Sequence, residues 1–232
     1  AEQRPWLELL EKRTFSLDSW PEKPPAGYMT DRAWRDMLEE FCASGAQNSS
    51  ALFMLGVMRH YDGEAGPALE AWKKSDGLCP SAWAKRALAL WEHRNGDKES
   101  ALLMYAGACL AARGEKAPAI EFARLCIAEK KYELYLETIE KCTHEVNNNP
   151  RVMLYKAACL IETGRLCEGE EILLSGITVP DIREGEVMTT DLWYRIKEKE
   201  LEGKPGAPRG EELSSYVRSN FTPPQSIDFR MN

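Results

Sequence analysis

The sequence has no run of apolar residues approaching the roughly 20 that a helix needs to cross a bilayer. Its first residues, AEQRPWLELL, also lack a charged and then apolar leader. We therefore expect a soluble chain that neither spans nor binds a membrane. The chain begins at Ala1 without a methionine, so we expect either a processed protein or a portion of a longer polypeptide.

Sequence motifs for catalysis and metal binding are missing too. There is no G-x-S-x-G, G-x-x-x-x-G-K-[ST], G-x-G-x-x-G, H-E-x-x-H or C-x-x-C, and the only histidines are the scattered His60, His93 and His144. Carboxylates such as Glu168 to Glu171 are sequence neighbours, whereas glycoside hydrolysis needs two carboxylates that face each other across a cleft. We predict a chain that is not an enzyme and that holds no cofactor and no metal.

The charge and the cysteines narrow the range of partners and compartments. The chain has 30 Lys and Arg against 37 Asp and Glu, a balance that argues against nucleic acid as a partner. Its seven cysteines are odd in number and lie among apolar neighbours, which is typical of free thiols in a reducing compartment. We therefore predict a cytoplasmic protein.

A pattern of small and aromatic residues recurs after 33 positions. Leu55-Gly56 corresponds to Leu88-Ala89. The same shift relates Gly63, Ala68, Trp72 and Ser75 to Gly96, Ala101, Tyr105 and Ala108. Apolar residues three and four apart predict helices, and the glycines predict the turns between paired helices. Weaker copies follow at Leu125-Cys126, Thr138, Cys142 and Pro150, and then at Ala157, Gly164, Gly169 and Leu173.

These residues resemble the tetratricopeptide repeat family, whose helix-turn-helix unit carries small residues at the helix crossings and a proline after the second helix. The resemblance implies an all-α fold, a right-handed superhelix of antiparallel helix pairs with a concave inner face. It covers residues 49–176, divided at about 49–81, 82–114, 115–149 and 150–176. We expect residues 1–48 to form an extended segment and a capping helix, and residues 177–232 a helix and an extended tail.

A second resemblance concerns the segments NSSALFMLGVMRHYDGEAGPALEAWKKSDGLCPSAWAKRALALWEHRNGDKESALLMY, IREGEVMTTDLWYRIKEKEL and PPQSIDFRM. They look like the C-terminal helical region of bacterial multidomain proteins in which a β-rich part, similar to sugar-mutarotase sandwiches, precedes the repeats. This likeness implies an alternative role as the accessory helical part of a larger carbohydrate-active or sugar-binding protein, packed against an upstream domain.

Both flanks carry their own signals. Pro21, Pro24 and Pro25 predict an extended segment before the repeats. The stripe Trp34, Met37, Leu38 and Phe41 predicts a helix that Thr30 or Asp31 caps. At the other end, Ile227, Phe229 and Met231 alternate, which predicts an extended tail with one apolar side.

The family resemblance also implies which residues face the concave groove: Phe53, Val57, His60, Arg86, Leu90, His93, Ala123, Ile127 and Lys130. Arg86 and Lys130 would clamp an acidic or C-terminal carboxylate. His60 and His93, 33 positions apart, would bind a carboxylate, a phosphate or, with a third ligand, a metal, or would lie at the groove rim with nothing bound. Trp72 is expected to pack inside its own repeat, and Trp83 or Trp91 to stack on a ligand if either faces the groove. The expected role is to hold a peptide, a helix or a neighbouring domain, with the oligomeric state left open.

Overall fold

The structure is a computed structural model that describes residues 3–17, 20–45, 48–177 and 188–228. Within these ranges there are thirteen α-helices, one short 3-10 helix and no β-strand, which confirms the prediction of an all-α chain. The chain divides into two compact units, Ala1–Phe122 and Ala123–Asn232, each described by itself below. No helix in the described part of the chain is long and apolar enough to span a bilayer.

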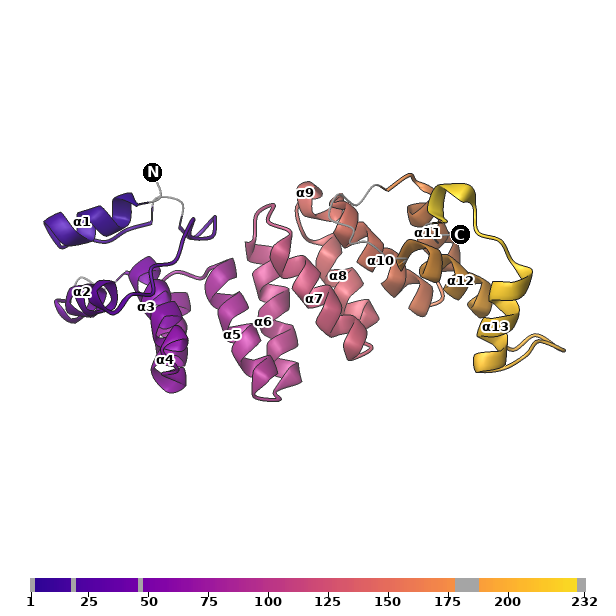
Figure 1. Cartoon of the computed structure of the whole chain (residues 1–232), viewed down its shortest axis with the longest axis horizontal. Coiled ribbons are helices and arrows are strands. Elements are labelled where there is room, and N and C mark those ends of the chain that lie inside the picture. The colour runs from indigo at the N-terminus through magenta and orange to yellow at the C-terminus, as the bar shows by residue number, and fades with distance from the viewer. Residues whose placement is uncertain (1–2, 18–19, 46–47, 178–187, 229–232) are drawn as a thin grey trace. The chain divides into compact units, whose positions relative to one another are not determined.

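The first unit holds six helices and the start of a seventh (Figure 1). They are α1 (Arg4–Lys12), α2 (Arg32–Ala43), α3 (Ser49–Tyr61), α4 (Ala65–Leu78), α5 (Ala82–Arg94), α6 (Lys98–Ala111) and α7 (Ala117–Ala128).

The second unit contains the end of α7 and the remaining helices. They are α8 (Tyr132–Glu140), α9 (His144–Asn147), α10 (Pro150–Glu162), α11 (Leu166–Leu174), α12 (Met188–Leu201), α13 (Glu211–Asn220) and the 3-10 helix η1 (Gln225–Ile227).

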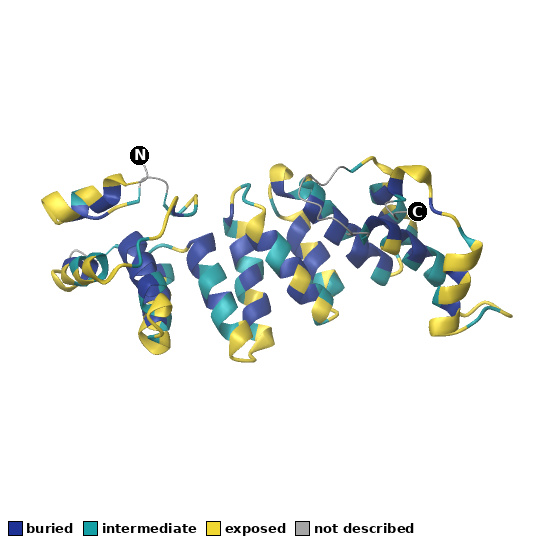
Figure 2. Cartoon of the chain, viewed as in Figure 1, coloured by how far each residue is buried: buried dark blue, intermediate teal, exposed yellow. Residues whose placement is uncertain are grey.

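Two helical hairpins, α3–α4 and α5–α6, form the centre of the first unit. Each turn contains a glycine in the left-handed region, Gly63 at φ 81° and Gly96 at φ 86°, a conformation that side chains with a Cβ rarely adopt. Side chains of Asn48 and Ser81 cap the starts of α3 and α5 by accepting backbone N–H groups. The turns are exposed while the facing sides of the helices are buried (Figure 2). The 33-residue pattern therefore corresponds to two consecutive hairpins.

Helices α3 and α4 approach closely where the pattern places small residues. A Cβ atom added to Gly56 would lie 2.4 Å from Nε1 and 2.5 Å from Cδ1 of Trp72, so only glycine fits opposite that ring. Ala68 on α4 is also completely buried. In the second unit, a Cβ on Gly169 of α11 would lie 2.7 Å from Cγ1 of Ile161 on α10. The small residues therefore allow the bulky ones opposite them to fit between paired helices.

The N-terminal region contains one helix that the sequence analysis did not predict. Pro5 stands in the first turn of α1, where a proline ring favours the helix because no hydrogen bond is lost. Trp6 of α1 lies edge-on to Phe15 and Trp34, with ring centroids 5.0 and 5.6 Å apart. The expected capping helix is α2, and its cap is Asp31, whose Oδ1 accepts from Ala33 N.

Between α1 and α2, residues 20–31 form neither helix nor strand, as the prolines predict. We call these residues the strap. Trp20 and Met29 of the strap pack against the core of the first unit.

The second unit differs from expectation at its C-terminal end. Helix α13 was not predicted, and residues 225–227 form a 3-10 turn where an extended tail was expected. Ile227 is buried in a core with Trp193 and Tyr194 of α12, and its carbonyl accepts from Thr190 Oγ1 at 2.6 Å. The buried Ile227 side chain and this hydrogen bond hold residues 225–227 against the second unit. Phe229 and Met231 lie outside the described residues.

Candidate functional site

A pocket of about 300 Å³ opens beside the two hairpins of the first unit. Helices α3, α4 and α5 and the strap supply its walls. The lining residues are Tyr28, Phe53, Val57, His60, Trp72, Trp83, Arg86, Ala87, Leu90, Trp91 and Arg94. The volume is at the small end for ligand pockets in proteins, so it suits one large side chain or a compact small molecule.

Five of the six groove residues predicted from the first two repeats line this pocket: Phe53, Val57, His60, Arg86 and Leu90. His93, the sixth, is exposed and does not line it. The two histidines occupy equivalent repeat positions, yet only His60 faces the pocket. The pair therefore does not form a joint site there.

The three residues from the third repeat belong to the second unit. Ala123 has no exposed surface, Ile127 is half-buried, and Lys130 is exposed. Lys130 lies two residues after the end of α7 in a left-handed conformation at φ 55°. Because Ala123 is completely buried, it offers no surface to a ligand.

Arg86 is already engaged inside the first unit. Its Nε and Nη2 donate to the two carboxylate oxygens of Glu121 at 2.7 and 2.6 Å. This two-point contact raises the pKa of Arg86 further above its usual value. Burial raises the pKa of the nearby Tyr28 hydroxyl, against an opposing effect of the Arg86 charge. A ligand carboxylate would have to displace Glu121 to reach this guanidinium.

The second arginine of the pocket, Arg94, is placed differently. Its Nη1 lies 3.0 Å from Nε2 of His60. Because a guanidinium only donates, Nε2 accepts this hydrogen bond and the ring proton lies on Nδ1. Arg94 is exposed and makes no ion pair with any described residue. Its charge is therefore not neutralised at the mouth of the pocket.

Two tryptophans in the wall keep unsatisfied donors. Trp72 and Trp83 are 5% and 6% exposed, and neither indole N–H meets an acceptor in the part of the chain that the structure describes. The Trp72 N–H edge lies against Gly56. Trp72 was predicted to be structural, and it is both part of the core and part of the pocket wall.

Three lining residues, Tyr28, Ala87 and Arg94, were not predicted from the sequence. Tyr28 belongs to the strap, which no repeat pattern places over the hairpins. Arg94 stands one position after the expected groove residue His93, and helical geometry places that next residue about 100° further around the helix. Its contact to His60 on the preceding hairpin identifies Arg94 as a pocket residue, and this contact is seen only in the structure.

The strap covers part of the same face. The Trp20 ring lies 4.8 Å from the Phe53 ring, and its Nε1 donates to Ser49 Oγ at 3.0 Å. Further along the strap, Glu22 Oε1 accepts from Arg113 Nη1 at 2.7 Å. Phe53, predicted to face a ligand, is 3% exposed; it belongs to the core of the first unit and the Trp20 ring of the strap lies on it.

The cysteines and acidic residues were compared with the requirements of a metal site. No group of three or more His, Cys, Asp or Glu side chains there is arranged to hold a metal ion. Burial raises the pKa of the Cys159 thiol to about 12 and also raises that of Cys126. These two thiols therefore stay protonated near neutral pH and are poor nucleophiles.

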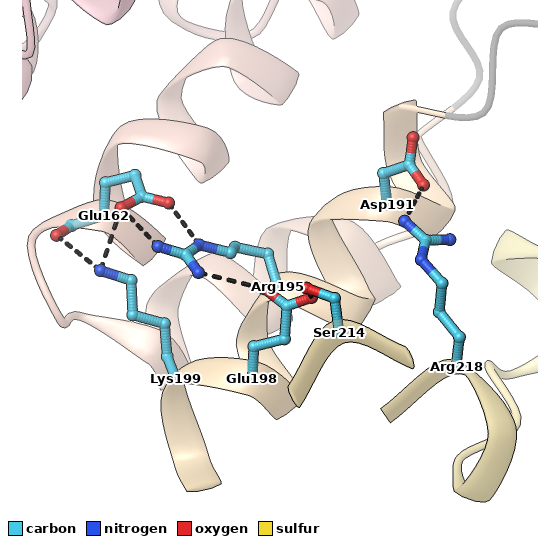
Figure 3. Close-up of polar contacts among 7 residues, drawn as sticks. All are labelled: Glu162, Asp191, Arg195, Glu198, Lys199, Ser214 and Arg218. Carbon is cyan, nitrogen blue, oxygen red and sulfur yellow. Dashed lines mark hydrogen bonds and ion pairs between the residues drawn. The ribbon is translucent and has the colours of Figure 1, made fainter. Parts of the chain in front are cut away.

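A network of charged residues in the second unit connects α10, α12 and α13 (Figure 3). Glu162 accepts from Arg195 Nε at 2.7 Å and pairs with Lys199 Nζ at 3.0 Å. Arg195 also bonds Glu198, which in turn accepts from Ser214 Oγ at 2.6 Å. Because each charge here has an opposite partner, the network stabilises helix packing and leaves no charge for a ligand.

This network predicts a pH dependence of stability. Burial raises the pKa of Glu162, but the bonds from Arg195 and Lys199 outweigh it, and the folded pKa lies below 4.5. Stability from Glu162 is therefore present above about pH 4.5 and lost as pH falls through the folded pKa. We expect Glu162→Gln to reduce the loss of stability between about pH 5 and 3, measured by urea unfolding with far-UV circular dichroism.

Glu202 supplies the control for that measurement. It is exposed, follows α12 and makes no ion pair among the described residues. Glu202→Gln is expected to keep the pH dependence of the unaltered chain. Equal slopes for all three proteins would contradict a contribution from Glu162.

A scan against models of known protein families gave no match, and a search of curated proteins gave none either.

Proposed function

We propose that this chain is a non-catalytic interaction module built from tetratricopeptide-like hairpins, which holds a peptide segment on the face formed by α3 and α5. Support comes from two consecutive hairpins with the small residues and glycine turns of that repeat. A partner protein or a neighbouring domain of the same polypeptide would present such a segment.

The observation that carries the proposal is the pocket between α3 and α5, the first helices of the two hairpins. Val57 and His60 of α3 meet Leu90 and Arg94 of α5 around a space that aromatic side chains enclose. Aromatic walls with a few polar groups at the mouth are typical of sites that hold one anchoring side chain. Neighbouring side chains hold His60 and Arg86 in place. The pocket therefore has a fixed wall against which one side chain can pack.

The strap gives independent support. It is an irregular, proline-containing segment that lies on α3 through Trp20 and reaches the loop after α6 through Glu22. The face therefore has the chemistry to hold a segment without regular secondary structure. An incoming peptide would use the adjoining pocket in the same manner.

The test is to fill the pocket. Ala87 of α5 lines it, so Ala87→Trp would occupy the space that a ligand side chain needs. Peptides selected from a random display library on the full chain are expected to bind the Ala87→Trp variant at least about tenfold more weakly, as for the loss of a central anchor.

Ala33→Trp is the matched control, because Ala33 is exposed on α2 and does not line the pocket. This control is expected to retain binding, and circular dichroism would verify that both variants fold. Selected peptides that bind Ala87→Trp as tightly as the unaltered chain would contradict the proposal.

A further inference from the structure

The strap shows which side-chain chemistry the α3 face holds. The indole of Trp20 lies on Phe53 with the ring planes tilted by 34°, while its N–H donates to Ser49. Two residues later, the carboxylate of Glu22 pairs with Arg113. The indole and the nearby carboxylate of the strap are thus held by Phe53 of α3 and by Arg113 of the loop after α6.

The neighbouring pocket offers the same two partners. Val57, Leu90 and the indoles of Trp83 and Trp91 supply an apolar and aromatic wall. At the mouth stands Arg94, which no described carboxylate neutralises. The pocket therefore has a place for a ring and a charge partner for an acid, as the strap site has.

The polar groups of the pocket are nearly all donors. The Arg94 guanidinium only donates, and His60 presents its remaining Nδ1–H because Nε2 accepts from Arg94, whereas the indole N–H groups of Trp72 and Trp83 are buried. Only the Tyr28 hydroxyl both donates and accepts. A ligand group that accepts hydrogen bonds fits this set, and a carboxylate also matches the charge of Arg94.

An aromatic pocket would also suit a cation, since ring faces attract ammonium groups. Here the guanidinium of Arg94 stands at the mouth and repels a second positive charge. The balance of charge thus favours an acidic ligand over a basic one.

We infer that the pocket binds an extended segment of a partner protein in which an aromatic side chain enters between α3 and α5 and a carboxylate close by pairs with Arg94. This inference rests on the proposed function. It names the partner chemistry as that of the strap itself, an aromatic residue followed two positions later by an acid.

The experiment uses three peptides with blocked ends, Gly-Ser-Phe-Pro-X-Gly-Ser, in which X is Glu, Gln or Lys. Each is titrated into the full chain while the side-chain N–H signals of its seven tryptophans are followed by NMR. Trp83→Phe and Trp91→Phe assign the pocket signals. The Glu peptide is expected to shift them and to bind about fivefold more tightly than the Gln peptide, and the Lys peptide most weakly.

Charge reversal at the mouth provides the second arm. Arg94→Glu is expected to reverse the order, so that the Lys peptide binds more tightly than the Glu peptide. Arg209→Glu makes the same change at an exposed arginine outside the pocket and is expected to keep the original order. Circular dichroism of both variants would verify folding.

Three results would overturn the inference: equal binding of the Glu and Gln peptides, tightest binding of the Lys peptide, or no shift of the pocket signals with any of the three. If peptides from the display library still depend on Ala87 in those cases, the proposed function stands and only the ligand chemistry is wrong. Loss of both results would reject the proposed function as well.

Discussion

Trp72→Ala is expected to lower the free energy of unfolding of the first unit by about 3–5 kcal/mol, the usual cost of removing a large buried aromatic side chain. Trp72 is 5% exposed, lies against Gly56, and has its ring 5.5 Å from that of His60. Its indole N–H has no acceptor among the described residues, so the loss comes from packing and not from a broken hydrogen bond. Urea unfolding followed by fluorescence would measure it.

Trp91→Ala is the control for this prediction. Trp91 also lines the pocket but is only half-buried. Its removal is expected to cost about 1 kcal/mol or less. If the two substitutions cost the same, Trp72 does not hold α3 and α4 together as the contacts indicate.

Gly56→Ala is expected to destabilise the first unit, although alanine favours helices. The added Cβ would lie 2.4 Å from Trp72 Nε1, and overpacking of this kind costs about 1–3 kcal/mol. The gain in helix propensity, at most about 1 kcal/mol, offsets only part of that cost. Urea unfolding would give the net change.

Gly77→Ala makes the same chemical change inside α4, where a Cβ would meet nothing within 4 Å. It is expected to stabilise the chain by about 0.5–1 kcal/mol. The two glycines should therefore respond with opposite signs. A Gly56→Ala variant as stable as Gly77→Ala would contradict the tight crossing of α3 and α4.

The two positions form a double-mutant cycle. When Trp72 is already alanine, the Cβ added at residue 56 has room, and Gly56→Ala is expected to cost nothing or to stabilise. The coupling energy between the two substitutions would measure their contact directly. Additive effects would show that the cost at Gly56 arises elsewhere.

The hairpins were predictable because their signals are local. Gly63 acts within its own turn, and Gly56 and Trp72 meet within a single hairpin. When two contacting residues are close in the sequence, their sizes show directly that they fit together. Five of the groove residues that the family resemblance implied line the pocket.

The rest of the site depends on contacts that periodicity does not encode. The strap lies over α3 because Trp20 meets Phe53, 33 residues away, and Glu22 meets Arg113, 91 residues away. From the sequence, Arg86 is expected to be a free cation that binds a ligand. The structure pairs it with Glu121, 35 residues away. Helix α1 was missed for a different reason, because Pro5 opens a helix as readily as it interrupts one.

Tethering gives the strap a thermodynamic role that a separate peptide would lack. A covalently joined competitor acts at an effective concentration in the millimolar range, whatever the protein concentration. A ligand that extends past the pocket onto Phe53 must displace Trp20. Its apparent affinity is the intrinsic affinity multiplied by the fraction of molecules in which the strap is not docked. Weakening the Trp20 contact would therefore tighten binding of long ligands while leaving short ones, confined to the pocket, unchanged.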